Sequence, residues 1–407
     1  MRILHTSDWH LGKNIEGYSR MDEQEAFLND FIEIVKNNNI DLIIIAGDIY
    51  DNPNPPARAE KMFYDTLKKL SYHGERLILV IAGNHDNPDR LVAAGPLARD
   101  HGIIMAGTPK SIIECGAYGN HKVLDSGEGF IEVEIHGEKS VILLVPYPSE
   151  KRLNEVIYGA MDGEEEQLQS YSERIKMLFD NLSSHYRDDT INIAVSHLFV
   201  MGSEEAGSER NVQLGGSFIV DGDYLPHKAQ YIALGHIHKP QVVPGTNKKA
   251  RYAGSPLHYN KKEINFKKSC YIVELEAGKE CNIQKIEFKV YKPIEIWKCE
   301  SIEEAIETCE HNAEKDCWVY IEIVTDRYIR EDEIKQMKST KKDILEIVPK
   351  IIEEDTEETD AFSFLEKSFA DIFREFYLKE RKVDPQEEVV ELLLSVIGEE
   401  EHNNEAY

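Results

Sequence analysis

The residue types best suited to binding metal ions recur in five short motifs along the sequence, and each motif follows a run of apolar residues. Aspartate and asparagine supply oxygen ligands and histidine supplies nitrogen ligands, a mixture that suits divalent transition metals. Taken singly, an Asp-x-His pair or a Gly-Asp step is common and more often marks a turn or a hydrogen-bonded core residue. The ordered set is rare, and it predicts a metal site with the following ligands: Asp8, His10, Asp48, Asn84, His197, His236 and His238.

These ligands are enough for two ions. Asp48 has two carboxylate oxygens and can bridge two cations, so we expect it to lie between them. The others divide into a first set, Asp8, His10 and His238, and a second set, Asn84, His197 and His236. Mixed nitrogen and oxygen ligands favour Mn²⁺, with Fe²⁺ or Mg²⁺ as substitutes, over structural Zn²⁺, which prefers thiolate cages. Two such ions about 3.5 to 4 Å apart can activate a hydroxide and clamp a phosphate, which indicates phosphate ester hydrolysis.

Short buried strands and amphipathic helices alternate in the first half of the chain, and each metal motif comes just after a predicted strand. This alternation predicts an α/β domain in which helices cover sheets, and strand ends are where open α/β folds place their sites. The predicted helices are Glu23–Asn37 and Arg58–Ser71. The predicted strands are Arg2–Thr6, Ile40–Ala46, Leu77–Ala82, Val141–Val145, Ile191–Ser196 and Tyr231–Leu234.

The rest of the chain divides by composition. We expect the α/β domain to span residues 1–265 and a small α+β module to span 266–350, with strands at Tyr271–Leu275, Ile283–Val290 and Trp318–Val324 and a helix at Ile302–His311. An acidic stretch around Asp162–Glu166 is typical of a solvated loop, and residues 351–360 are typical of an acidic linker. Two short amphipathic helices follow within 361–400, with more apolar surface than they can bury by themselves. They dock either on their own chain or on a partner.

The charge and the cysteines narrow the class of protein. The net charge is −28, but residues 351–407 alone hold 18 acidic and 5 basic residues, while Thr246–Ser269 is basic. The 6 cysteines form no C-x-x-C pair, which argues against a zinc ribbon and a disulfide scaffold. No basic start with a long apolar run and no stretch near ~18 apolar residues is present, so we expect a cytoplasmic protein without a membrane span.

The motifs together resemble the calcineurin-like metallophosphoesterase superfamily up to about Pro256, and within it most closely the SbcD-like DNA repair nucleases. That narrower resemblance rests on sequence blocks at Arg2–Lys13, Asp48–Pro56, Gly83–Arg90 and Gly254–Pro256. It implies a four-layer sandwich, two packed β-sheets flanked by helices, with a small α+β capping domain and a C-terminal helical pair. It also implies a Mn²⁺-dependent nuclease with ATP-dependent double-strand 3′–5′ exonuclease and single-strand or hairpin endonuclease activity, acting in DNA repair and recombination.

The resemblance further implies roles for residues beside the metals. His85 would lie next to the ions without binding them and protonate the leaving oxygen, or else only orient Asp48 or the phosphate. Archaeal relatives carry a histidine where this chain has Asp51, which leaves that position without an assigned role. Candidate DNA contacts are Arg90, Lys248, Lys249, Arg251, Lys261 and Lys262, although ordinary surface charge explains them too.

Partners follow from the same resemblance. Family members bind the coiled coil of an ATPase subunit, SbcC, through the position of the helices within 361–400, in a heterotetramer. They dimerise through helices that here include Arg58–Ser71 and Asp89–Asp100. Two other functions stay open from the sequence. A small-substrate or cyclic nucleotide phosphodiesterase would share the ligands, and a non-catalytic scaffold would share the fold.

Overall fold

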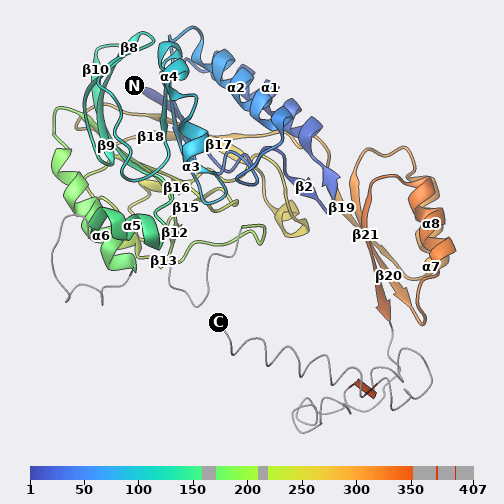
Figure 1. Cartoon of the computed structure of the whole chain (residues 1–407). Coiled ribbons are helices and arrows are strands. Elements are labelled where there is room, and N and C mark those ends of the chain that lie inside the picture. Colours follow the sequence, from blue (N-terminus) through green and yellow to red (C-terminus); the bar gives the residue numbers. More distant parts are fainter. Residues whose placement is uncertain (158–170, 210–218, 352–372, 375–389, 391–407) are drawn as a thin grey trace. The chain divides into compact units, whose positions relative to one another are not determined.

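The computed structural model describes residues 1–157, 171–209, 219–351, 373–374 and 390 of the chain (Figure 1). The acidic loop at 162–166, most of the expected linker at 351–360 and most of the expected helical pair at 361–400 lie outside the described residues. Residues 1–325 and 329–350 belong to one compact unit. None of the helices in the described part of the chain combines the length and the apolar character that a membrane crossing requires.

The first sheet has six strands in the order β18-β17-β1-β4-β5-β6. Strands β1, β4, β5 and β6 run parallel, β17 pairs antiparallel with β1, and β18 pairs antiparallel with β17. Parallel strands buried on both faces need nearly continuous apolar sequence, and β4 and β5 have the sequences LIIIA and LILVI. The strands are β1 (Arg2–Thr6), β4 (Leu42–Ala46), β5 (Leu77–Ile81), β6 (Ile103–Ala106), β17 (Ser269–Glu274) and β18 (Asn282–Glu287).

The second sheet has eight strands in the order β15-β16-β14-β11-β10-β9-β8-β7. Strands β16, β14, β11 and β10 are parallel, and the remaining strands pair antiparallel with their neighbours. Its strands are β7 (Gly116–Tyr118), β8 (His121–Gly127), β9 (Phe130–Ile135), β10 (Glu138–Val145), β11 (Ile191–His197), β14 (Tyr231–Gly235), β15 (Gln241–Val242) and β16 (Ala250–Tyr252). Two short ladders join β2 (Asn14–Ile15) to β3 (Tyr18–Ser19) and β12 (Phe199–Val200) to β13 (Ile219–Val220).

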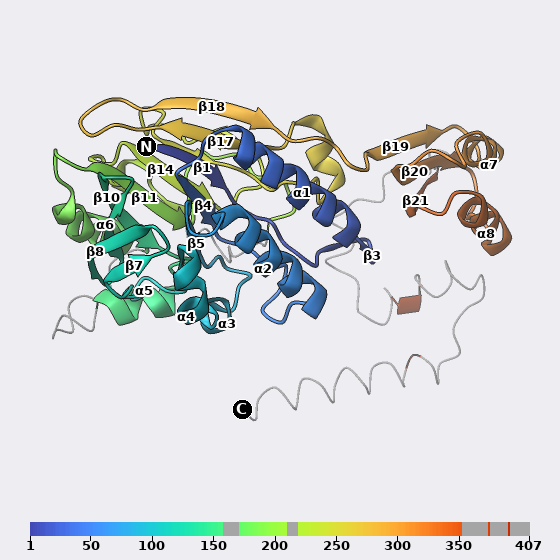
Figure 2. The same ribbon diagram turned by 90° about the horizontal axis from the view of Figure 1, so that it is seen from above.

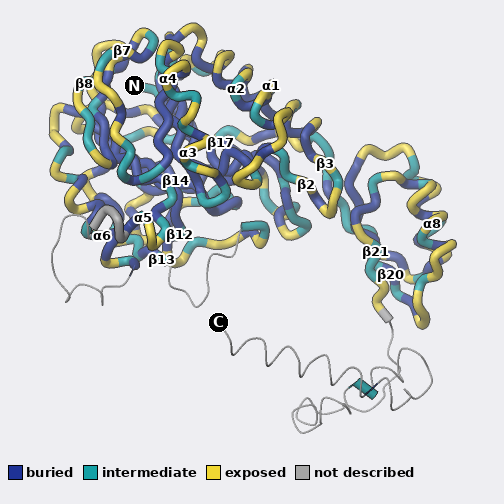
Figure 3. Tube along the Cα trace, viewed as in Figure 1, coloured by how far each residue is buried: buried dark blue, intermediate teal, exposed yellow. Residues whose placement is uncertain are grey.

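The two sheets pack face to face, and helices cover their outer faces (Figure 2). Helices α1 (Met21–Asn37) and α2 (Ala57–Ser71) pack on the first sheet, and α6 (Tyr171–Leu182) packs on the second near α5 (Glu150–Ile157). A third apolar cluster fills the space between the sheets, where the tube in Figure 3 is buried. Two short helices, α3 (Pro88–Val92) and α4 (Gly95–Ala98), follow β5. The expected four-layer α/β arrangement is confirmed.

A separate three-stranded sheet, in the order β19-β20-β21, carries two helices on one face. Its elements are β19 (Ile294–Cys299), α7 (Ile302–His311), β20 (Trp318–Thr325), α8 (Glu331–Thr340) and β21 (Ile344–Ile351). Ile15 packs with this sheet's other face, and the Trp318 indole donates a hydrogen bond of 2.8 Å to Glu23. The expected boundary near residue 265 needs correction, because β17 and β18 extend the first sheet and the three-stranded sheet begins only at Ile294.

Candidate metal centre

The seven predicted ligands come from the carboxyl ends of five parallel strands. β1, β4 and β5 are neighbours in the first sheet, and β11 and β14 are neighbours in the second. Carboxyl ends of parallel strands meet at one edge of a sheet, and the packed sheets bring both edges to the same end of the domain. Asp8 and His10 follow β1, Asp48 follows β4, Asn84 follows β5, His197 ends β11, and His236 and His238 follow β14.

The backbone at these strand ends is held in an uncommon conformation. Four of the predicted ligands have positive φ angles, which cost L-residues free energy and cluster at functional sites. They are Asp8 (53°), His10 (45°), Asp48 (50°) and His236 (102°). Hydrogen bonds between turns hold them there, for example from the Asp8 amide to Gly47 O at 3.0 Å. The turns after β1, β4 and β14 are therefore shaped to direct side chains inward.

Two glycines let these turns approach one another closely. A Cβ atom at Gly83 would lie 2.1 Å from Asp48 Oδ1, and one at Gly235 would lie 1.8 Å from Ala46 O. Both distances are far below van der Waals contact. The glycine of each motif is therefore a packing requirement of the site as well as a turn residue.

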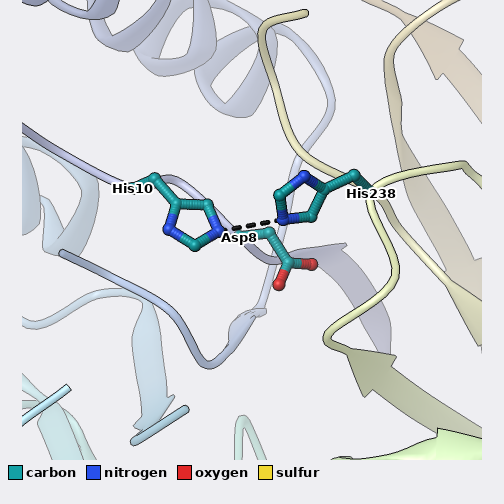
Figure 4. Close-up of side chains that lie close together, drawn as sticks. All are labelled: Asp8, His10 and His238. Atoms are coloured by element: carbon teal, nitrogen blue, oxygen red, sulfur yellow. Dashed lines mark hydrogen bonds between the residues drawn. The ribbon is translucent and has the colours of Figure 1, made fainter. Parts of the chain in front are cut away.

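The side chains of the first predicted set, Asp8, His10 and His238, lie close together (Figure 4). His10 Nε2 and His238 Nε2 lie 2.9 Å apart. Ligand atoms of Asp8, His10 and His238 all lie within 4.8 Å of one another. Because two imidazole nitrogens point at the same place, a proton or a metal cation must lie between them. His10 Nδ1 is buried and has no hydrogen-bond partner among the residues that the structure describes.

The second predicted set also converges, with Asp48 between the two sets. Asn84 Oδ1 lies 2.9 Å from His197 Nε2 and 3.1 Å from His236 Nδ1. Asp48 Oδ2 lies 3.6 Å from His10 Nε2 and 3.5 Å from His197 Nε2, so one carboxylate oxygen faces both sets. The amide nitrogen of Asn84 has no hydrogen-bond partner among the described residues. This is the arrangement that a bridging carboxylate between two cations requires.

Burial and neighbouring charges shift the pKa values of the predicted ligands. Burial raises the pKa of Asp8 to about 6, and the nearby Asp48 carboxylate adds to that rise. Burial also opposes ionisation of Asp48, but the facing His197 and His10 outweigh it and hold the pKa of Asp48 well below its ordinary value. Burial lowers the pKa of His236 to about 3, which leaves a neutral imidazole with a free lone pair. Carboxylate oxygens and imidazole nitrogens gathered in one buried place are ligands for divalent cations, so the donor set fits a pair of metal ions.

His85 lies beside the predicted ligands without joining either set. Its backbone amide donates to Asp48 Oδ1 at 2.9 Å, and its Nδ1 lies 2.6 Å from Asp51 O. A carbonyl oxygen only accepts, so Nδ1 carries the hydrogen and Nε2 remains available for proton transfer. The ring is half-buried and 4.8 Å from that of His10, centroid to centroid. Asp51 accepts a 2.7 Å hydrogen bond from Lys13 and lies 3.8 Å from His10 Nδ1.

Four residues that the sequence analysis did not single out surround His238. Ser208 Oγ lies 2.5 Å from His238 Nδ1 and donates to Glu263 Oε1. Lys268 Nζ, in a side chain only 3% exposed, lies 2.5 Å from Glu263 Oε2. Glu209 accepts the His238 backbone amide at 3.0 Å. A metal-binding histidine commonly donates its second N–H to an acceptor that fixes its orientation. The block Gly254–Pro256 was the nearest sequence signal, and its Ser255 hydroxyl accepts from Lys268.

The candidate DNA contacts fall in different places. Arg90 is exposed and forms an ion pair of 2.9 Å with Glu60, as a helix-surface salt bridge would. Lys261 and Lys262 begin a 3₁₀ turn (Lys261–Asn265) that contains Glu263, close to the His238 surroundings. Lys248, Lys249 and Arg251 instead lie at the start of β16, whose partner β14 reaches the metal site only at its other end. The basic stretch Thr246–Ser269 is therefore divided between two places in the domain.

Comparison with known proteins agrees with this geometry. A family profile described as "Calcineurin-like phosphoesterase" matches residues 1–240. The SbcD subunit of the nuclease SbcCD from Bacillus subtilis is 38% identical over 398 residues, covering 97% of each chain. The chain belongs to the SbcD family of calcineurin-like phosphoesterases. Further SbcD relatives are the proteins of the same name from Rhodobacter capsulatus, 30% identical over 68% of this chain and 67% of that one, and from Escherichia coli K12, 30% identical over 81% and 80%.

Membership of the SbcD family makes the chain a metal-dependent phosphoesterase of the nuclease class. A second profile, described as "Type 5 capsule protein repressor C-terminal domain", matches residues 290–381. That match begins four residues before β19, so it starts where the three-stranded sheet starts. The SbcD resemblance noted from the sequence is confirmed, and the match across 97% of the Bacillus subtilis protein extends it beyond Pro256.

Proposed function

We propose that this chain is the nuclease subunit of an SbcCD-type complex and hydrolyses DNA phosphodiesters with two divalent metal ions, Mn²⁺ in the first instance. The observation that carries the proposal is the position of Asp48, whose Oδ2 faces His10 at 3.6 Å and His197 at 3.5 Å. Around it the remaining predicted ligands point inward from both sheets. A site for one ion would not need ligands on both sides of a bridging carboxylate.

Each ion has a ligand set in this proposal. The first would be held by Asp8, His10 and His238, the second by Asn84, His197 and His236, and Asp48 would be shared. Bound there, the two ions would supply Lewis acidity and a hydroxide nucleophile at neutral pH. The four imidazoles and few carboxylates favour Mn²⁺ or Fe²⁺ over Mg²⁺, which prefers oxygen.

The chain's own residues perform the proton transfer and the positioning. His85 keeps its Nδ1 hydrogen on Asp51 O at 2.6 Å, which fixes the ring. As the imidazolium it gives its Nε2 proton to the leaving 3′ oxygen and becomes the neutral Nδ1–H imidazole. Its backbone amide holds Asp48 in place. Lys13 neutralises Asp51 at 2.7 Å, so the carboxylate beside His10 does not repel an incoming phosphate.

DNA approaches the ions past positively charged residues of the 3₁₀ turn and the three-stranded sheet. Lys261 lies 4.8 Å above the Tyr320 ring and 3.4 Å from Glu346, so it spans from the turn to the sheet. Lys262 is exposed beside it. We propose these two lysines as phosphate contacts and the three-stranded sheet with α7 and α8 as the cap of the site.

The same proposal covers partners. The Bacillus subtilis and Escherichia coli relatives are both subunits of a nuclease called SbcCD. Residues 361–400 would bind the coiled coil of the ATPase subunit SbcC, and α2 with residues 89–100 would form a homodimer. Deleting everything after Asp360 should leave metal-dependent nuclease activity and abolish association with the ATPase. Persistent association, measured by gel filtration of the mixed proteins, would contradict the assignment of the tail.

The rival function is hydrolysis of small phosphodiesters such as cyclic nucleotides, because it needs the same ligands. A scaffold without activity is disfavoured, because every predicted ligand position carries a metal-ligating side chain. The purified full-length chain should be incubated with Mn²⁺ and, in parallel, with a plasmid, a DNA hairpin and cyclic nucleotides. The proposal expects DNA cleavage that EDTA abolishes. Rapid turnover of cyclic nucleotides without DNA cleavage would establish the rival.

A further inference from the structure

A basic groove lies at the end of the second sheet opposite to the metal centre. It has a volume of about 770 Å³ and is formed by residues that precede β11, β14 and β16 and by the turn between β17 and β18. Its positively charged lining residues are Arg187, Lys228, Lys248, Lys249, Arg251 and Lys279, against the acids Asp188 and Glu280. In a chain with a net charge of −28, such an excess of cations around one concavity is unusual.

Several of these cations make few ion pairs or hydrogen bonds with the described residues of the chain. Arg187 is paired with Glu132 at 2.8 Å, and Lys279 with Glu276 at 2.6 Å. Lys249 donates only to a backbone carbonyl, that of His227, among its described contacts. Lys228 and Lys248 are exposed and form no ion pair or hydrogen bond to any described residue. The groove therefore keeps a positive field that an anion can use.

The Arg251 side chain is held in place by a contact with the first sheet. It lies on β16 opposite Ala233 of β14, and its guanidinium lies 5.3 Å from the Tyr271 ring centroid, on the first sheet. Its Nε is buried and makes no hydrogen bond to the described part of the chain. A buried N–H without an acceptor is unfavourable, so an anionic oxygen beside this guanidinium would be favoured. A guanidinium held by an aromatic ring with an unused donor is well suited to phosphate.

The groove is separate from the metal centre. Gln230, which lines it, precedes β14, and His236 follows β14, so at about 3.3 Å per residue the two ends lie about 20 Å apart. A phosphate bound by the metals cannot also occupy the groove. Its size falls within the roughly 300–1,000 Å³ of small-molecule sites. Duplex DNA, a convex rod, fits a recessed arginine poorly.

We propose that this groove binds a small polyphosphate ester of nucleotide size, of which a nucleoside triphosphate is representative. The phosphates would contact Arg251, Lys228 and Lys248, and the organic part would lie against the apolar surface of Ile283 and Cys281. The four lining cations that form no ion pair with the described residues, Lys228, Lys248, Lys249 and Arg251, outnumber the two lining acids, so the groove keeps a net positive charge for an anion. This site is independent of the phosphodiesterase site and of the function proposed above.

The test uses the full-length, Mn²⁺-loaded chain. Binding of inorganic tripolyphosphate and of ATP is measured by calorimetry for the wild type, for Lys228→Ala/Lys248→Ala and for Lys122→Ala, an exposed lysine on β8 outside the groove. We expect binding at least about tenfold weaker in the double variant, because two charge-assisted contacts to phosphate are lost. The Lys122→Ala variant should bind like the wild type. Both changed lysines are exposed, so the fold should persist.

Lysine acylation followed by mass spectrometry locates the ligand. Tripolyphosphate or ATP should protect Lys228 and Lys248 and leave Lys122 reactive, whatever else binds at the metal centre. Equal affinity of the double variant and the wild type, or no protection, would overturn the proposal. Protection by a 20-base-pair duplex alone would also overturn it, because the groove would then be a nucleic-acid surface.

Discussion

Glu263 offers the sharpest test of how the metal ligands are held. Its carboxylate accepts hydrogen bonds from Lys268 Nζ at 2.5 Å and the Tyr259 amide at 3.1 Å, and it accepts from Ser208, which contacts His238 Nδ1. Glu263→Gln keeps the shape of the side chain but removes its negative charge. It also places an amide N–H donor beside groups that themselves donate to Glu263. We expect it to disturb both the fold and the orientation of His238.

The two effects have different sizes. Lys268 is 3% exposed and Glu263 0%, so the variant leaves an unpaired buried ammonium, at a cost of about 3–5 kcal/mol of unfolding free energy. Loss of the acceptor behind His238 should weaken Mn²⁺ binding roughly 10- to 100-fold. The second effect corresponds to about 1.4 to 2.7 kcal/mol. Urea unfolding in EDTA measures the first, and competition with a chelating dye for Mn²⁺ measures the second.

A double variant separates them. Glu263→Gln/Lys268→Met removes the unpaired ammonium and should recover most of the stability, while Mn²⁺ binding stays weak. Glu276→Gln, which breaks an exposed ion pair with Lys279, is the matched control and should change neither quantity by much. If the double variant recovers wild-type affinity for Mn²⁺, Glu263 only neutralises Lys268 and the positioning argument is refuted.

Three other predictions follow from the structure. His85→Gln should keep both metals, by dye competition, and lose cleavage by about 100-fold or more; unchanged cleavage would remove its role as the acid. Gly83→Ala places a Cβ atom 2.1 Å from Asp48 Oδ1, so it should weaken metal binding and lower the free energy of unfolding by about 1–3 kcal/mol. Gly95→Ala, where a Cβ atom meets open space, should change neither quantity. Equal metal binding in both variants would show that the close approach is not required. Burial lowers the pKa of His5 to about 3, whereas in the unfolded chain it is about 6.5. Between these pH values protons bind the unfolded chain and not the folded protein, so the free energy of unfolding falls as the pH falls from 6.5 toward 3. The expected loss at pH 5 is about 2 kcal/mol. Urea unfolding in EDTA at pH 7 and 5 should show a smaller loss for His5→Phe than for the wild type, and an equal loss would contradict the assignment.

The sequence predicted the elements whose signal is local. β1 and α7 have the predicted bounds, and the other strands that carry metal ligands lie within two residues of prediction, because buried parallel strands are continuous apolar runs. The ligand motifs follow those runs directly. Their convergence was therefore predictable from the rule that parallel strands share an edge.

What could not be predicted depends on contacts between distant residues. β17 pairs with β1 across more than 260 positions, and nothing local distinguishes such a strand from one in a neighbouring module. Glu263 and Lys268 look like surface residues in the sequence, and only the fold buries them against each other. The basic stretch looks like one surface in the sequence because its lysines are close together along the chain. In the fold, Lys248 precedes β16 and Lys261 follows it, so the two lysines lie at different ends of the domain.

X-ray diffraction from a crystal of the full-length chain soaked in Mn²⁺, measured at the manganese absorption edge, would locate the ions in the site. We expect two anomalous peaks about 3.5 to 4 Å apart with Asp48 bound to both. One peak should have Asp8, His10 and His238 as ligands, and the other Asn84, His197 and His236. A single peak, or a pair that Asp48 does not bridge, would contradict the two-metal proposal.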